Sequence, residues 1–271
     1  MVIYLYHNGE LSGIWLAFEG GTGQAFTVFS EVDMIKGIYA SGVGMMARQT
    51  RQEVISNNLA NINTTGFKKD MISFRNVMSA DLLLNENPDV QAIEFSKTDF
   101  SQAELKKTDN PFDFAINGKG FFKVSDGQNE FYTRAGNFKL NEEYELITAQ
   151  GMKVVGEGGP IVLEDGEFTA LKNGDVAVDD LVVGKLALID FENPNQLLKI
   201  GSNLYQKTDE SGPGRGIESQ IHQGFLEGSN VSAVDEMINM IVVAREFEQN
   251  QKAIQSQDET LSKLLNETTR V

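Results

Sequence analysis

The chain has 271 residues, a formal net charge of −16 and no cysteine. The excess of acid opposes binding to nucleic acid or anionic lipid, both of which need clustered Lys and Arg. The absence of cysteine excludes disulfides, thiolate metal sites and cysteine nucleophiles. Hydrophobic residues make up 41% of the chain, which is typical of a sequence that folds around a core. The only histidines, His7 and His222, leave little metal or acid–base chemistry, and no cofactor is predicted.

Residues 1–33 differ from the rest of the chain. Their apolar run from Ile14 to Phe18 lies between Glu10 and Glu19 and follows no basic region, so it does not resemble a signal peptide. No other stretch approaches the ~18 uninterrupted apolar residues of a membrane span, and we expect no membrane insertion. We also expect this segment to make few packed contacts with the remainder.

Residues 34–62 predict an amphipathic helix, because they contain no proline and their apolar side chains recur at spacings near three, four and seven. These side chains are Ile38, Met45, Ile55, Leu59 and Ile62. Gln52 interrupts the stripe. We expect the helix to stop near Asn63–Gly66, where β-branched residues lower helix propensity and Gly66 can adopt a positive φ.

The middle of the chain, residues 75–224, predicts a β-rich domain of hairpins. Short apolar runs such as Phe112–Ile116 and Phe121–Val124 alternate with turn signals such as Asn117–Gly120. The glycine-rich segment Gly156–Pro160 lacks the Lys and Ser or Thr of a phosphate loop, so a hairpin turn is favoured there.

The last predicted element is a long helix that Ser229 or Asn230 can cap. Residues 231–271 contain neither Gly nor Pro. An apolar row recurs every seven residues along it, formed by Met240, Phe247, Ile254 and Leu261. This segment carries a charge of −3 whereas residues 34–69 carry +4, which favours pairing of the two ends.

These patterns together predict an α+β fold. Long N- and C-terminal helices would pair as a coiled-coil-like unit, with a β-rich middle domain of hairpins between them. The predicted divisions are an N-terminal extension, a helix with its linker, the middle domain and the C-terminal helix, at 1–33, 34–74, 75–224 and 225–271.

Three segments resemble flagellar rod and hook proteins, and they follow the order found in that family. They are Asn57–Lys68 (NNLANINTTGFK), Asn110–Phe122 with Tyr132–Phe138, and Gly224–Val231 followed by Glu236–Ile238. The resemblance covers residues 34 to about 268. It is strongest to the rod subfamilies, and among these to a proximal-rod subunit.

The resemblance implies a structural subunit of the bacterial flagellar basal-body rod. Such a subunit leaves the cytoplasm through the flagellar type III export apparatus without cleavage of a signal peptide. It then assembles with copies of itself and with other rod and hook-basal-body subunits into a helical tube whose terminal helices line a central channel. Family members ordinarily begin at a methionine just before the first helix, here Met34, so residues 1–33 are interpreted as a misassigned start or a lineage-specific extension.

Three other functions compete with this interpretation. A distal-rod or hook subunit of the same family would share the motifs, and an exported β-rich binding module would leave the matched terminal helices unexplained. A cell-wall glycan hydrolase is a rival because carboxylates are abundant. Nothing in the sequence sets one carboxyl group in an apolar pocket beside an ionised partner, so we expect no enzyme and no catalytic, cofactor or metal residue.

Ten residues are candidates for assembly contacts. They are Asn57, Asn58, Leu59, Asn61, Gly66 and Phe67 at the end of the first helix, and Met240, Phe247, Ile254 and Leu261 in the second. A carboxamide both donates and accepts hydrogen bonds, which suits a repeated interface. Asn57 and Asn58 lie inside a helix that they do not favour, so intersubunit or long-range contacts are expected of them, whereas Asn63 and Gly66 are expected to end the helix.

Overall fold

The computed structural model describes residues 2–7, 10–16, 31–76, 92–163, 166, 168–179 and 181–268. The chain divides into two compact units, each described here by itself. The helical unit combines residues 1–53, 74–95 and 239–271, and the β-rich unit combines residues 54–73 and 96–238. The domain boundaries expected from the sequence stay a prediction.

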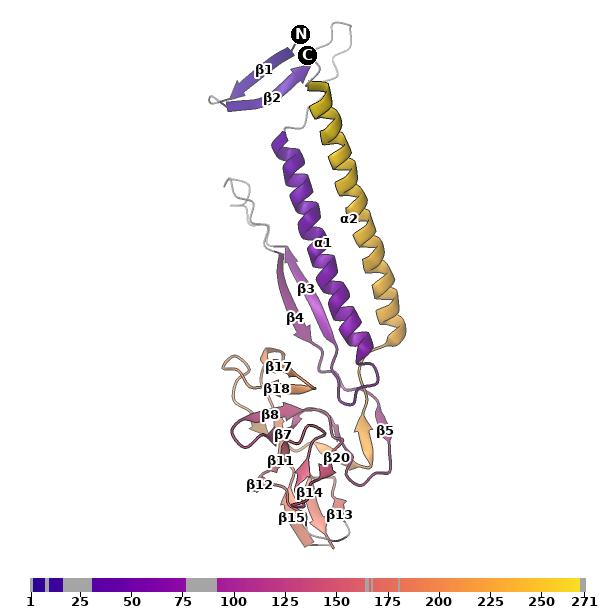
Figure 1. Cartoon of the computed structure of the whole chain (residues 1–271). Coiled ribbons are helices and arrows are strands. Elements are labelled where there is room, and N and C mark those ends of the chain that lie inside the picture. The colour runs from indigo at the N-terminus through magenta and orange to yellow at the C-terminus, as the bar shows by residue number, and fades with distance from the viewer. Residues whose placement is uncertain are drawn as a thin grey trace. The chain divides into compact units, whose positions relative to one another are not determined.

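Two helices are present in the described residues, α1 (Glu31–Ala60) and α2 (Ala233–Thr268) (Figure 1). Helix α2 begins after Ser232, whose hydroxyl accepts a hydrogen bond from the N–H of Asp235 at 3.4 Å. Asp235 and Glu236 lie in the first turn, where negative charge is stabilised by the helix dipole. The cap is therefore Ser232, and the prediction of Ser229 or Asn230 was wrong. Neither helix of the described chain is long and apolar enough to cross a membrane.

Two strand pairs come from the parts of the sequence that precede and follow α1. Strand β1 (Val2–His7) pairs antiparallel with β2 (Glu10–Leu16), so part of the first 33 residues is a hairpin. Strand β3 (Asp70–Asn76) pairs with β4 (Ala92–Thr98) in a separate two-stranded sheet.

The predicted fold class is wrong, because the two helices do not form the expected coiled-coil-like pair. Among the described residues they meet through polar groups, because Arg48 Nε lies 2.6 Å from Glu246 Oε2 and the backbone of Gly44 approaches the amide of Asn250. No residue of α1 or α2 belongs to either hydrophobic cluster of the described chain. A coiled-coil-like pair is held by apolar side chains that repeat along its seam, whereas these contacts between the helices are polar.

The middle is more than a series of hairpins, because pairs of consecutive antiparallel strands are joined into a larger sheet. It contains a curled ten-stranded sheet in which strands far apart in sequence are neighbours. Its main path runs β17 (Leu198–Gly201), β18 (Leu204–Gln206), β8 (Glu130–Thr133), β7 (Phe121–Ser125), β11 (Lys153–Gly156), β10 (Leu146–Ile147) and β9 (Lys139–Leu140). Strand β12 (Gly159–Pro160) pairs with β11, β16 (Leu188–Asp190) with β7, and β19 (Arg215–Gly216) with β16.

Smaller sheets complete the β-rich unit. One contains β13 (Phe168–Ala170), β14 (Asp175–Val178) and β15 (Leu181–Lys185). Two strand pairs are β6 (Phe114–Asn117) with β20 (Gln220–Gln223), and β5 (Leu105–Lys107) with β21 (Phe225–Glu227). A 3₁₀ turn, η2, spans Pro194–Gln196. In both strand pairs a strand from residues 105–117 pairs with one from 220–227, which closes the unit.

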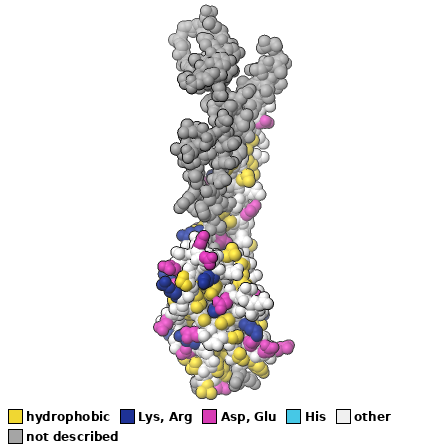
Figure 2. Space-filling model, turned by 90° about the vertical axis from the view of Figure 1, so that its left-hand side faces the viewer, with side chains coloured by type: hydrophobic (Ala, Val, Ile, Leu, Met, Phe, Trp, Pro, Cys, Tyr) yellow, Lys and Arg dark blue, Asp and Glu magenta, His cyan; other side chains and the backbone are white. Residues whose placement is uncertain are grey.

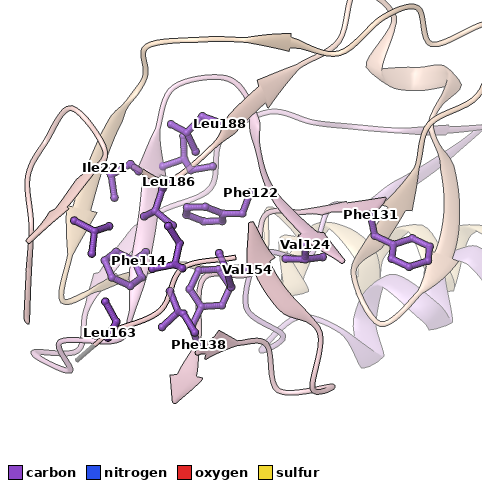
Figure 3. Packing of buried hydrophobic residues seen from close by; sticks show 14 of the residues in the cluster. Phe114, Phe122, Val124, Phe131, Phe138, Val154, Leu163, Leu186, Leu188 and Ile221 are labelled. Carbon is purple, nitrogen blue, oxygen red and sulfur yellow. The ribbon is translucent and has the colours of Figure 1, made fainter. Parts of the chain in front are cut away.

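The core lies on both faces of β7. Figure 3 shows Phe122 and Val124 within the larger cluster, with Phe114 and Leu188 from other strands. The neighbouring Phe121 points into a second cluster with Tyr132, Phe191, Leu197 and Tyr205. Successive side chains of a strand point to opposite faces, so two adjacent buried phenylalanines require that both faces of β7 be covered.

The outer surface of the β-rich unit carries mixed charge. Figure 2 shows Lys and Arg side chains intermixed with Asp and Glu on the face that it presents. Many of these groups form exposed pairs, such as Lys107 with Asp109 at 2.7 Å. Pairs of this kind contribute about 0 to 1 kcal/mol each, so surface charge is not what holds the unit together.

Gly66 has a φ of 67°, which confirms the positive value predicted for it. The helix ends six residues earlier, at Ala60. There the side-chain amide of Asn61 donates to the carbonyl of Asn57 at 2.9 Å. A Cβ at position 66 would lie 2.4 Å from the backbone nitrogen of Ala135, closer than real Cβ contacts allow. Glycine is therefore needed there for close packing as well as for its dihedral angle.

Replacing Gly66 with Ala is expected to lower the free energy of unfolding by more than the ~1 kcal/mol of a positive-φ substitution alone, because backbone atoms must move apart. Gly127→Ala is the matched control, since Gly127 has a φ of 95° and open space around it. Urea unfolding of both purified chains measures the difference. Equal losses of stability in the two variants would contradict the packing argument.

Candidate functional site

The segment that follows α1 lies directly against the segment that precedes α2. The N–H of Gly66 donates to the carbonyl of Glu227 at 2.8 Å, and the N–H of Asn230 donates to the carbonyl of Phe67 at 3.4 Å. The Asn230 side chain adds a third bond by accepting from the N–H of Lys69 at 2.8 Å. We call this meeting point the junction, and it lies within the β-rich unit.

A buried charge cluster forms the centre of the junction. Lys68 and Glu227 have fully buried side chains, and Lys68 Nζ lies 2.6 Å from Glu227 Oε1. Arg134 Nη1 approaches the other carboxylate oxygen at 3.3 Å. Lys68 also donates to the carbonyl of Ser101 at 2.6 Å, and Glu227 accepts from the N–H of Ala103 at 2.9 Å. One carboxylate therefore serves two buried cations.

Burial works against both cations. It lowers the pKa of Lys68, and the attraction of Glu227 opposes that change. It likewise lowers the pKa of Arg134, which gains compensating contacts by donating to the carbonyl of Gly118 at 2.9 Å and by lying over the ring of Phe121 at 5.4 Å. Buried charges are tolerated only when they are paired and hydrogen-bonded, so each member of the cluster requires the others.

A second set of contacts joins the end of α1 to β3 and β17. The carboxamide of Asn58 donates to the carbonyl of Asp70 at 2.9 Å and accepts from the N–H of Asp70 at 3.0 Å. Lys199 then binds the Asp70 carboxylate at 2.8 Å while its Nζ lies 4.4 Å from the centre of the Phe67 ring. Asn58 is buried, and its hydrogen-bonding groups are used within the chain.

The predicted residues at the end of α1 have different environments. Asn57 is exposed, Leu59 and Asn61 are half-buried, and Phe67 is buried. Asn61 donates to Asn57 and accepts from the Thr64 hydroxyl at 3.1 Å, so it serves the helix end. The expectation that these residues contact other subunits stays a prediction.

In α2, Met240, Phe247 and Ile254 are half-buried, while the side chain of Leu261 lies outside the described part. The larger exposed apolar surface of this helix is on another side, and we call it the α2 apolar face. It consists of Val234, Met237, Ile238 and Ile241, which are 66%, 53%, 54% and 54% exposed. Their spacing of three and four residues is a helical signal, but the predicted row contained only residues seven apart.

The junction residues were also missed as a group. Lys68, Arg134 and Glu227 all lie within the quoted segments, yet nothing in the sequence indicates that they meet. Among the described residues, no group of three or more His, Asp or Glu is arranged to hold a metal ion. The arrangement found here is suited to holding chain segments together.

Three family descriptions match the chain. Residues 38–68 match a flagella basal body rod protein family, residues 115–183 the flagellar hook protein FlgE/F/G D1 domain, and residues 222–267 the flagellar basal body rod FlgEFG protein C-terminal domain. The flagellar basal-body rod protein FlgG of Bacillus subtilis (strain 168) is 34% identical over 261 residues, covering 86% of this chain and 99% of the relative.

The chain belongs to the flagellar basal-body rod protein family. FlgG of Buchnera aphidicola subsp. Schizaphis graminum is 36% identical, over 85% of this chain and 99% of that protein. FlgF of Caulobacter vibrioides, also described as a basal-body rod protein, is 34% identical over 79% of this chain and 90% of that protein. The predicted family is confirmed, and the protein is a structural rod subunit of the flagellar basal body.

The charge cluster brings the three matched regions of this rod protein together. Lys68 comes from the first region, Arg134 from the second and Glu227 from the third. The partners Lys68 and Glu227 are 159 residues apart in sequence. The junction is therefore the structural link between parts that sequence comparison treats separately.

Glu227→Gln is expected to destabilise the β-rich unit more than Lys68→Met. The first change leaves two buried cations without a counter-charge, whereas the second leaves Glu227 paired with Arg134. Breaking a buried pair costs about 3 to 5 kcal/mol, so Glu227→Gln should reach at least that range. Lys107→Met, at an exposed pair, is the control and should cost no more than about 1 kcal/mol. Chemical denaturation gives the ranking, and a Lys68→Met loss equal to or larger than that of Glu227→Gln would contradict the shared-carboxylate interpretation.

Proposed function

We propose that this rod subunit joins its neighbours through the α2 apolar face, while the junction keeps its β-rich unit folded. The observation that supports the proposal is the exposure of Val234, Met237, Ile238 and Ile241 on successive turns of one continuous helix. Apolar side chains grouped in this way favour a contact with another protein surface.

The opposite side of the same helix supports the proposal further. Val243 is fully buried and Met240 and Phe247 are half-buried, so the first turns of α2 are apolar on two sides. Apolar side chains on two sides of a helix favour contacts with other protein surfaces on both sides. For α2 the proposed environment is the assembled rod, with the row of Met240, Phe247, Ile254 and Leu261 as a proposed second contact.

The partners proposed are copies of this chain and other subunits of the rod and hook-basal body. The relatives named above are described as basal-body rod proteins, which supports this choice. We also propose export through the flagellar type III apparatus, as the family resemblance implies. Binding and scaffolding, with no catalysed reaction, are the proposed activity.

The double substitution Met237→Asp and Ile241→Asp is expected to abolish motility and to stop rod assembly. It places two charges where apolar contact is proposed, and an unpaired buried charge is very costly. The full-length purified variant should keep the unfolding transition of its β-rich unit, because neither side chain belongs to the hydrophobic clusters.

Gln255→Asp with Ser256→Asp is the matched control, since it adds the same charge at exposed polar positions of the same helix. Soft-agar swimming and electron microscopy of isolated basal bodies measure the outcome in a deletion strain supplied with each variant. Motile cells with complete rods in the Met237→Asp, Ile241→Asp variant would contradict the proposal.

A further inference from the structure

A polar groove of about 280 Å³ opens beside the junction. Its walls are the end of α1, the loops that carry Asn137 and Gln150, and the turn between β17 and β18. All of these belong to the β-rich unit. We call it the carboxamide groove, because Asn57, Asn137 and Gln150 line it together with Asn61 and Asn203.

The carboxamides divide into two groups by their use. The side-chain amides of Asn61 and Asn203 donate hydrogen bonds within the chain. Asn203 donates to the carbonyl of Thr65 at 2.8 Å. Asn61 donates to the carbonyl of Asn57 at 2.9 Å. The side chains of Asn57, Asn137 and Gln150 make no hydrogen bond to the part of the chain that the structure describes. Three donor and acceptor pairs are therefore available in the groove.

The groove carries no free charge. Lys199 is the one charged residue among its described lining, and its Nζ is occupied by the Asp70 carboxylate at 2.8 Å and the carbonyl of Lys68 at 3.3 Å. A site without free charge gives little stabilisation to an ion. It suits a neutral ligand that donates and accepts alternately, as a peptide main chain does.

The walls of the groove are held in place before any ligand arrives. Ser202 and Asn203 form the β17–β18 turn with φ values of 51° and 58°. The carbonyl of Asn203 accepts from the Thr133 hydroxyl at 2.9 Å, and its side chain holds the chain at Thr65. A preorganised site loses less conformational entropy on binding, which favours recognition by few hydrogen bonds.

We propose that the carboxamide groove binds an extended, uncharged main-chain segment of a second copy of this chain. The proposal rests on the rod function proposed above and names a contact within it. Copies that each carry a net charge of −16 repel one another, so their close contacts are favoured where the surface is uncharged and rich in hydrogen-bonding groups. The carboxamide groove meets both conditions.

The test compares a groove variant with a matched control in cells. The groove variant carries Asn57→Ala, Asn137→Ala and Gln150→Ala. The control carries Gln128→Ala, Asn195→Ala and Gln196→Ala, which removes three exposed carboxamides elsewhere on the same unit. At about fivefold per lost hydrogen bond, affinity at the groove should fall on the order of a hundredfold in the first and stay unchanged in the second.

The occupant is identified by photo-cross-linking. The chain has no cysteine, so an introduced cysteine is its only thiol and fixes the position of the label. A thiol-linked benzophenone is attached to an Ala135→Cys variant, because Ala135 lines the groove. The same label on a Gln128→Cys variant is the control, since Gln128 lies in an exposed loop and does not line the groove. In assembled basal bodies we expect a product containing two copies of this chain from position 135 only. Adding the groove substitutions should reduce its yield at least tenfold.

The outcomes separate this proposal from the rod function. Motile cells in which position 135 cross-links only to a different protein, or to nothing, would overturn the groove proposal and leave the rod function standing. An undiminished cross-link in the groove variant would overturn it as well. Normal motility in the deletion strain itself would overturn both. An unfolding transition of the groove variant equal to that of the control verifies that any loss arises from the contact.

Discussion

The structure of the β-rich unit depends on one shared carboxylate. Glu227 balances Lys68 and Arg134 where their side chains are buried, and each of these charges would be strongly unfavourable alone. The cluster therefore forms only when three distant parts of the chain have arrived together. A buried ion pair is weak evidence for net stability, because apolar residues of similar volume are often as stable in its place.

The junction and the α2 apolar face have different roles. The junction is polar and buried and its charges pair within a single copy, whereas the α2 apolar face begins only seven residues after Glu227 and is exposed. Hydrogen-bonded charges give direction and register, and apolar surface gives a non-directional drive toward association. The proposed assembly through α2 therefore uses a surface separate from the contacts that hold the junction.

Local features were predictable from the sequence and long-range ones were not. The motif around Gly66 indicated its positive φ, although the helix ends six residues earlier and the close approach to Ala135 was not predicted. The ten-stranded sheet was not accessible, because strands of two to five residues leave no clear periodicity and β7 is buried on both faces. The row through Phe247 showed that α2 is amphipathic but could not show which side stays exposed. The burial of Lys68 was not predictable, because its partner Glu227 lies 159 residues away.

The segment that follows α1 and the segment that precedes α2 are joined by hydrogen bonds, of which the bond from Gly66 to Glu227 is 2.8 Å long. Tension applied to these two segments would act first across the junction. The buried charge cluster and its neighbouring backbone bonds would then bear that load before the hydrophobic core does.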